Sequence, residues 1–79
     1  MERNEQQEEL KAHLMVAEED FRHLVEEHAN YDRRIEALEA LPHPTTEEEV
    51  EEHRLKKLKL RVKDQIEEFL SRHRTMQTV

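Results

Sequence analysis

The chain has no cysteine and no glycine, and aromatic residues make up only 4% of its 79 residues. Without cysteine it cannot form disulfide bonds or thiolate metal sites. The lack of glycine is consistent with long helices. A chain this short buries little apolar surface on its own, and oligomerisation commonly compensates for that. The sequence therefore predicts one small domain over residues 1–79, without disulfides.

Long apolar runs and an excess of basic residues are also missing. The longest apolar run, residues 14–17, is far shorter than the ~20 residues of a membrane-spanning helix. Residues 1–5 lack the apolar stretch of a signal peptide. The net charge of −7 argues against a general binder of nucleic acids or anionic membranes. We therefore expect a soluble cytoplasmic protein with no membrane association.

Charged residues are abundant instead, at 42% of the chain. Such a composition can indicate disorder. Here, however, the apolar residues recur at helical spacing, and glutamate, lysine, arginine, leucine and glutamine are good helix formers. The pattern favours long charged helices over a disordered chain.

The first periodic segment defines an apolar seam between residues 10 and 38. Its members alternate in steps of four and three residues, which places them on one stripe of a helix, as in a heptad repeat. All are apolar or aromatic except one histidine. The seam consists of Leu10, Leu14, Ala17, Phe21, Leu24, His28, Tyr31, Ile35 and Leu38. This pattern predicts a first helix over about residues 5–40.

The two prolines of the chain lie in residues 41–46 and predict a turn there. Each proline removes a backbone donor and disfavours helical geometry at the residue before it. Thr45 or Thr46 can then cap a second helix, with Glu48 or Glu49 completing a capping box. No other such interruption is visible in the sequence.

The second helix is predicted over about residues 47–73, followed by a loose tail over residues 74–79. Its apolar residues share one face with a period near 3.6. They are Leu55, Leu58, Val62, Ile66 and Phe69. Two amphipathic helices joined by a short turn predict an all-α fold, an antiparallel two-helix hairpin with coiled-coil-like packing.

The pairing of the two helices around the turn sets their register. Leu58 is expected level with His28, and Phe69 level with Ala17, so that a large side chain lies opposite a small one. Because each helix then buries only one stripe, we expect two or more hairpins to associate into a homo-oligomeric helical bundle. Three apolar residues point away from the seams and are candidates for this contact: Met15, Val16 and Leu60.

His28 is the polar member of the seam, and Asp32 follows it by one helical turn. One interpretation is a pH-sensitive switch or a ligand. The favoured interpretation is a packed histidine that fixes the register of pairing. The other histidines form several i,i+4 pairs with glutamate, which arise easily by chance in an acidic chain, and no four-ligand zinc motif is present. We therefore predict no metal and no other cofactor.

The strongest charge feature is a basic stretch over residues 54–63. Its cations are Arg54, Lys56, Lys57, Lys59, Arg61 and Lys63. Apolar residues interleave them, and no aromatic residue is available to stack on bases. Pairing with Glu26, Glu27 and Asp32 of the first helix is therefore favoured. The alternative is a nucleic-acid-associated factor that uses this stretch.

Nothing in the sequence indicates catalysis. The chain has no glycine-rich phosphate loop and no arrangement of serine, histidine and aspartate typical of an activated nucleophile, and two helices imply no concave scaffold. We predict a non-enzymatic structural or interaction module that self-associates and recognises a protein partner through its helix faces. The partner and the number of copies stay open.

Two motifs carry a resemblance to a known family. They are Phe21-x2-Leu24-x3-His28-x2-Tyr31-Asp32-x2-Ile35-x2-Leu38-Glu39 and Leu55-Lys56-Lys57-Leu58-Lys59-Leu60-Arg61-Val62-Lys63-Asp64-Gln65-Ile66. Over about residues 14–70 the chain resembles the YdcH-like family, small bacterial proteins with a domain of unknown function. Tyr31 and Gln65 depart from the family's usual leucine and glutamate. The resemblance implies a short helical hairpin in the bacterial cytoplasm, with no established activity, substrate or cofactor.

The resemblance also indicates which positions to consider for function. The family's histidine corresponds to His28, and its Lys-Asp pair corresponds to Lys63 and Asp64. With the charged residues around them, these positions form the candidate functional surface. It consists of His28, Asp32, Lys56, Lys57, Lys59, Lys63 and Asp64.

Overall fold

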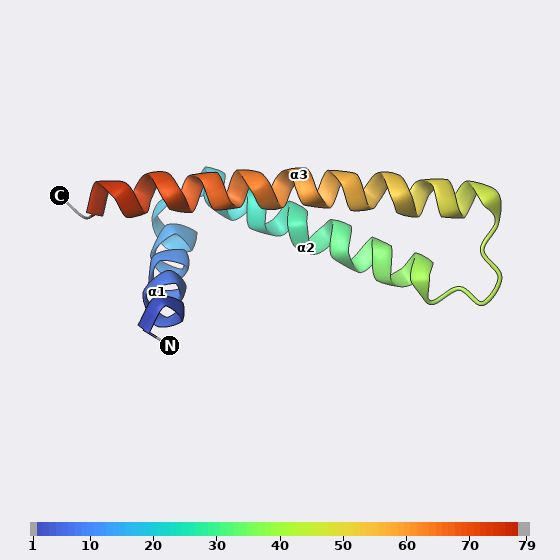
Figure 1. Ribbon diagram of the computed structural model, residues 1–79, viewed down its shortest axis with the longest axis horizontal. Coiled ribbons are helices and arrows are strands. Elements are labelled where there is room, and N and C mark those ends of the chain that lie inside the picture. The colour runs from blue at the N-terminus through green and yellow to red at the C-terminus, as the bar shows by residue number, and fades with distance from the viewer. Residues whose placement is uncertain (1, 78–79) are drawn as a thin grey trace.

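A computed structural model describes the backbone of residues 2–77 and the side chains of residues 7–74. Within that part of the chain there are three helices and no strand: α1 (Glu2–Ala17), α2 (Glu19–Glu39) and α3 (Thr46–Gln77). The predicted all-α class is therefore confirmed. Figure 1 shows α3 running back alongside α2, with the loop over residues 40–45 at one end and α1 at the other. We refer to these two long helices together as the α2–α3 pair.

The start of α3 is fixed by its own first turn. The Thr45 hydroxyl accepts a hydrogen bond from the Glu48 backbone N–H at 3.1 Å, and the Glu48 carboxylate accepts one from the Thr45 N–H at 2.8 Å. This reciprocal pair is the predicted capping box, and it satisfies donors that the start of a helix leaves unpaired. At its other end α3 continues to Gln77, so residues 74–77 are helical and were wrongly expected to form a loose tail. Residues 78 and 79 lie outside the described part.

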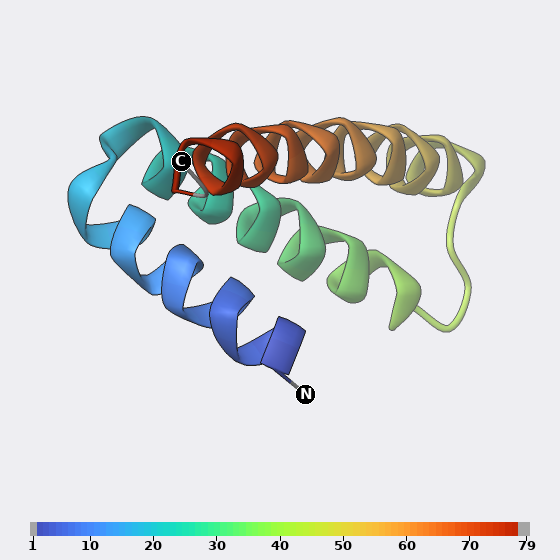
Figure 2. The ribbon, with the colours of Figure 1, turned by 60° about the vertical axis from the view of Figure 1, so that its left-hand side comes forward.

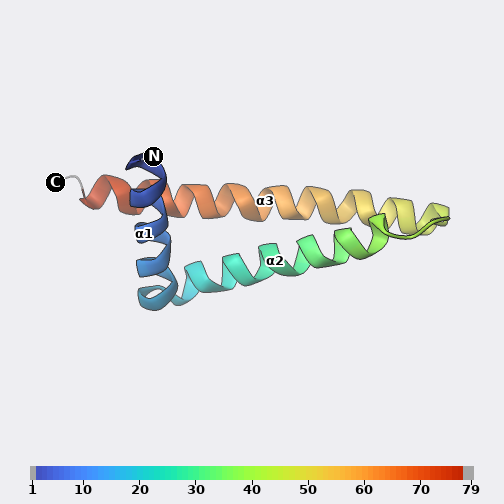
Figure 3. The same cartoon turned by 90° about the horizontal axis from the view of Figure 1, so that it is seen from below.

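The predicted single helix over about residues 5–40 is wrong. The chain leaves helical geometry at Glu18, whose φ of −120° and ψ of 110° are extended, and α1 turns away from the direction of α2 (Figures 2 and 3). The Arg22 guanidinium donates a hydrogen bond to the Met15 carbonyl at 3.2 Å. This bond satisfies one of the acceptors that the end of α1 leaves without a partner in the helix.

The packing of the helices explains the bend, which no proline or glycine marks in the sequence. Phe21 of α2 packs against Phe69 of α3, with ring centroids 5.4 Å apart. Because α3 runs back alongside α2 (Figure 1), a straight extension of α2 would carry Leu10 beyond Gln77, the last described residue of α3. With the bend, Leu10 and neighbouring Leu14 are buried instead.

The core lies where the three helices meet. Leu10, Leu14, Phe21 and Leu70 form its buried cluster, and Met15, Val25, Ile66 and Phe69 pack against it. Ile35, Leu55 and Val62 are buried further along the α2–α3 pair. Fully burying a side chain of this kind contributes about 1.5–3 kcal/mol. The bend at Glu18 therefore concentrates apolar burial at the end of the molecule away from the loop.

The predicted seam and register hold only in part. Leu10, Leu14, Phe21, Ile35, Leu55 and Val62 are buried, whereas Leu24, His28, Tyr31, Leu38, Leu58, Ile66 and Phe69 are half-buried. Ala17 is exposed because it precedes the bend, so Phe69 packs on Phe21 rather than lying level with Ala17. The observed register thus differs by about one helical turn from the predicted one.

The described helices include none whose length and apolar content would suit a membrane span. The molecule is elongated, measuring 52 × 24 × 18 Å. Grooves lie along both long edges of the α2–α3 pair.

Candidate functional site

One edge of the α2–α3 pair gathers most of the predicted surface residues in a groove of about 490 Å³. We call it the lysine groove. It is lined by Asp32, Ile35, Glu36, Glu39, Lys56, Lys59, Leu60 and Lys63. Helical spacing explains this grouping, because residues three or four positions apart project from the same side of a helix. Acidic side chains of α2 thus face lysines of α3 across the groove.

The ammonium groups of two lysines are engaged within the chain. Lys59 donates a hydrogen bond to the Asp32 carboxylate. The Lys56 Nζ lies 3.2 Å from a carboxylate oxygen of Glu39 and 3.0 Å from one of Glu52. The pairs with Asp32 and Glu39 link α3 to α2, whereas the pair with Glu52 lies within α3. Together they hold the two lysines in place along the groove.

A second set of ion pairs lies near the loop. The Arg34 guanidinium is 3.4 Å from a Glu51 carboxylate oxygen, which also lies 3.0 Å from the Arg54 guanidinium. The predicted pairing of the basic stretch with acidic residues of the first helix is therefore confirmed for Asp32. It is wrong for Glu26 and Glu27, since within residues 7–74 the basic stretch forms no ion pair with either of them. Lys56 pairs instead with Glu39 of α2, and Arg54 pairs with Glu51 of its own helix.

The ion pairs shift the pKa values of two groups in the groove. The hydrogen bond from Lys59 is the main reason why the pKa of Asp32 lies below its ordinary value of 3.8; the positive charges of Lys59 and His28 add to it, and partial desolvation opposes it. Hydrogen bonds to Glu52 and Glu39 raise the pKa of Lys56 above its ordinary value. Both shifts favour the charged forms of these groups.

The remaining members of the predicted surface lie apart from this groove. His28 is half-buried and, with Lys63, borders an apolar groove between α1, α2 and α3. The Asp32 carboxylate accepts its hydrogen bond from Lys59, while His28 acts on it only through charge. Lys57 and Asp64 are exposed, and helical spacing places them on the outward side of α3. The structure therefore divides the predicted surface among three places.

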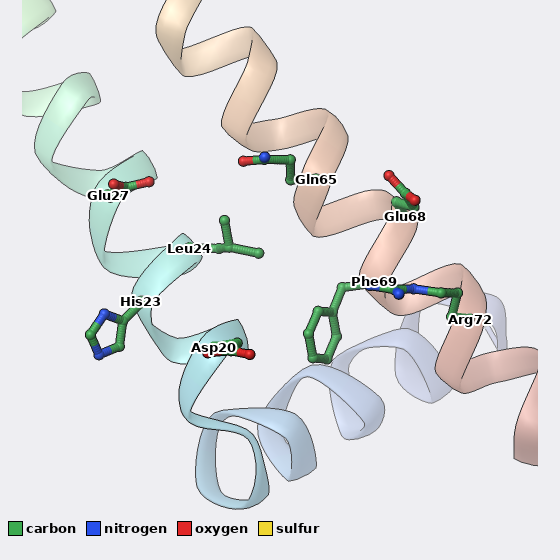
Figure 4. Close-up of a pocket in the computed structure, with 8 residues that line it drawn as sticks. All are labelled: Asp20, His23, Leu24, Glu27, Gln65, Glu68, Phe69 and Arg72. Atoms are coloured by element: carbon green, nitrogen blue, oxygen red, sulfur yellow. The ribbon is translucent and has the colours of Figure 1, made fainter.

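The opposite edge of the α2–α3 pair carries a groove of about 440 Å³ that was not predicted (Figure 4). It is lined by Asp20, His23, Leu24, Glu27, Gln65, Glu68, Phe69 and Arg72. Figure 4 shows Leu24 and Gln65 pointing toward each other across the groove, whereas the His23 ring points away from α3. Its carboxylates and His23 do not converge, and no group of three or more histidine, aspartate or glutamate side chains within residues 7–74 could hold a metal ion.

The Phe69 ring in this second groove contacts two side chains of the following helical turn. The His73 ring stacks on it with centroids 4.6 Å apart and planes 5° from parallel, and the Arg72 guanidinium lies 5.6 Å from its centroid. His73 also lies 3.6 Å from the carboxylate of Glu18, the residue at the bend. The spacing of Phe69, Arg72 and His73 at i, i+3 and i+4 in the sequence could have predicted this cluster.

Comparison with known proteins adds one match. The model of a family described as a protein of unknown function (DUF465) matches residues 21–70, which cover nearly all of α2, the loop and most of α3. Comparisons with curated proteins and with solved structures gave no match. The matched residues include the whole lysine groove and leave out α1.

Proposed function

The chain belongs to the DUF465 family, with which the predicted YdcH-like resemblance agrees, and we propose that it is a non-enzymatic helical interaction module of the bacterial cytoplasm. In this proposal the α2–α3 pair is an antiparallel hairpin that associates with further copies into a bundle. It recognises a protein partner through the same kind of contact, between amphipathic helix faces.

The observation that carries this proposal is the exposure of Leu60 on the edge of the lysine groove. Leu60 is 59% exposed, and Lys56 and Lys63 lie on the same side of α3. An apolar side chain bordered by charged ones resembles the anchor and rim of a protein interface. Val16 is 82% exposed and is a second candidate contact. Met15 is half-buried and packs against the core, so less of its side chain is available for such a contact.

The ion pairs weigh against nucleic-acid binding. Three cations of the basic stretch, Arg54, Lys56 and Lys59, are already paired with carboxylates of the same chain. Phosphate contacts by these residues would require those ion pairs to break. We therefore favour a protein partner, and the two functions differ in a measurable way: binding of labelled DNA or RNA with steep salt dependence would support the nucleic-acid alternative.

Sedimentation equilibrium of the wild type and of Leu60→Gln tests self-association. Burial of a leucine side chain contributes about 1.5–3 kcal/mol, so the substitution is expected to weaken association by about tenfold or more. Val50→Gln is the matched control, because Val50 is 62% exposed on α3 but lies outside the lysine groove. Circular dichroism of each variant checks that helicity is unchanged. A wild type that stays at 9.6 kDa over the whole concentration range would contradict self-association.

A further inference from the structure

The bend at Glu18 creates an apolar groove of about 330 Å³ between the three helices. Its walls are formed by Met15 of α1, Phe21 and Val25 of α2, and Ile66 and Leu70 of α3. Most of the surface that these residues present in the groove is apolar. We call it the three-helix groove. It is distinct from the contact around Leu60 proposed above, although Lys63 borders both.

The rim of the three-helix groove carries two lysines from different helices, Lys11 of α1 and Lys63 of α3. Neither has an ion-pair partner within 4.0 Å among the side chains that the structure describes, in contrast to Lys56 and Lys59. Glu67 is the acidic residue on the same rim, and His28 also borders it. At neutral pH the rim therefore has a net positive charge, although the whole chain has a net charge of −7.

From this arrangement we propose that the three-helix groove binds a small amphiphilic anion, with a single apolar chain against the walls and a carboxylate-type head group between Lys11 and Lys63. The volume lies at the low end of the ~300–1,000 Å³ of small-molecule sites, which suits one chain of medium length rather than a whole membrane lipid. A partner helix would need anchor positions spread over several turns, so the short groove fits it less well.

Titration calorimetry with sodium decanoate, below the concentration at which it forms micelles, tests the proposal. We expect saturable binding of one decanoate per chain. Octanoate should bind about tenfold more weakly, because each methylene removed from contact costs about 0.8 kcal/mol. Decanol, which has the same chain without the charge, should also bind more weakly than decanoate. Equal affinities for decanoate and decanol would contradict the role of the lysines.

Variants locate the site on the chain. Lys11→Gln is the most informative substitution, because Lys11 borders the three-helix groove and not the lysine groove. It should weaken decanoate binding several-fold and leave decanol binding unchanged. Val25→Trp should fill the groove and weaken both ligands. Lys57→Gln is the matched control on the outward side of α3, and it should change neither.

Circular dichroism and sedimentation equilibrium on the same samples check that each variant keeps its helicity and its mass. Decanoate binding that Lys11→Gln and Val25→Trp both leave unchanged would place the ligand elsewhere and overturn the proposal. A lack of saturable decanoate binding, with binding of an acidic amphipathic peptide that Val25→Trp removes, would also overturn it and assign the groove to a protein segment.

Discussion

At the end of the molecule where the three helices meet, the contacts are mainly apolar, whereas near the loop they include several exposed ion pairs. The first end buries Leu10, Leu14, Phe21 and Leu70 in one cluster. Toward the loop, Ile35 and Leu55 are buried outside that cluster. Around these two residues, ion pairs such as Lys56–Glu39 and Arg34–Glu51 join α2 to α3.

The two ends therefore contribute differently: the apolar contacts mainly stabilise the fold, and the ion pairs mainly specify the register of the helices. Apolar burial contributes about 1.5–3 kcal/mol for each large side chain, whereas exposed ion pairs typically contribute about 0–1 kcal/mol. The end with α1 therefore accounts for more of the stability. The ion pairs contribute mainly to the register of the α2–α3 pair, because each one requires a particular lysine or arginine to lie level with a particular carboxylate.

The largest expected effect on stability comes from shortening one buried leucine at each end. Leu14→Ala changes the end with α1 and Leu55→Ala the end near the loop, and both leucines are only 1% exposed. Removing a buried leucine costs about 2–5 kcal/mol, depending on how many neighbours line the cavity that is left. We expect Leu14→Ala to lie near the upper end of this range and Leu55→Ala near the lower end. Urea unfolding followed by circular dichroism measures both. A larger loss of unfolding free energy for Leu55→Ala than for Leu14→Ala would contradict the greater contribution of the end with α1.

At the loop end, the largest effect of a single polar group should come from the capping box. Thr45→Ala removes the hydroxyl that accepts the Glu48 N–H bond, and such a change lowers the free energy of unfolding by about 1 kcal/mol. Thr46→Ala is the control, since Glu48 bonds to Thr45. Thermal unfolding of the two variants should separate them. Equal melting temperatures would show that the capping box does not limit the stability of this end.

The smallest effect concerns the pH dependence that Asp32 introduces. Its pKa is lower in the folded chain than its ordinary value of 3.8, so the Lys59–Asp32 pair stabilises the fold above that value. This stabilisation is lost as the pH falls through the lower, folded-state pKa. Asp32→Asn should therefore flatten the acid side of the stability–pH curve, and the exposed Asp64→Asn should not. An unchanged curve for Asp32→Asn would contradict the pKa shift.

The features that the sequence predicted correctly depend on short-range chemistry. The capping box needs only Thr45 and Glu48 at fixed spacing, and the turn needs only the prolines. The grouping of Lys56, Lys59 and Lys63 on one edge of α3 was not predicted, although helical spacing alone accounts for it. That this edge faces Asp32 depends on how α2 and α3 pair. The position of the turn predicted the register of this pairing to within about one helical turn.

The features that were missed depend on contacts between segments. Residues 10–38 keep an unbroken helical pattern through Glu18, so local preference gives no sign of the bend there. The bend follows from where Leu10 and Leu14 can be buried, which depends on the position of Leu70 across the molecule. The three-helix groove is a consequence of the same bend. For that reason no motif in the sequence could have indicated it.

The bend at Glu18 determines where the core and the three-helix groove form, and a distance between α1 and α2 tests it most directly. The chain has no cysteine, so Glu9→Cys and Glu36→Cys introduce two unique sites for spin labels on exposed positions. A continuous helix would separate these residues by ~40 Å along its axis. Pulsed electron paramagnetic resonance should give a mean distance between the two labels well below this value, because α1 turns away at Glu18 (Figure 2). A narrow distribution centred near ~40 Å would instead establish the straight helix and contradict the bend, the core and the three-helix groove.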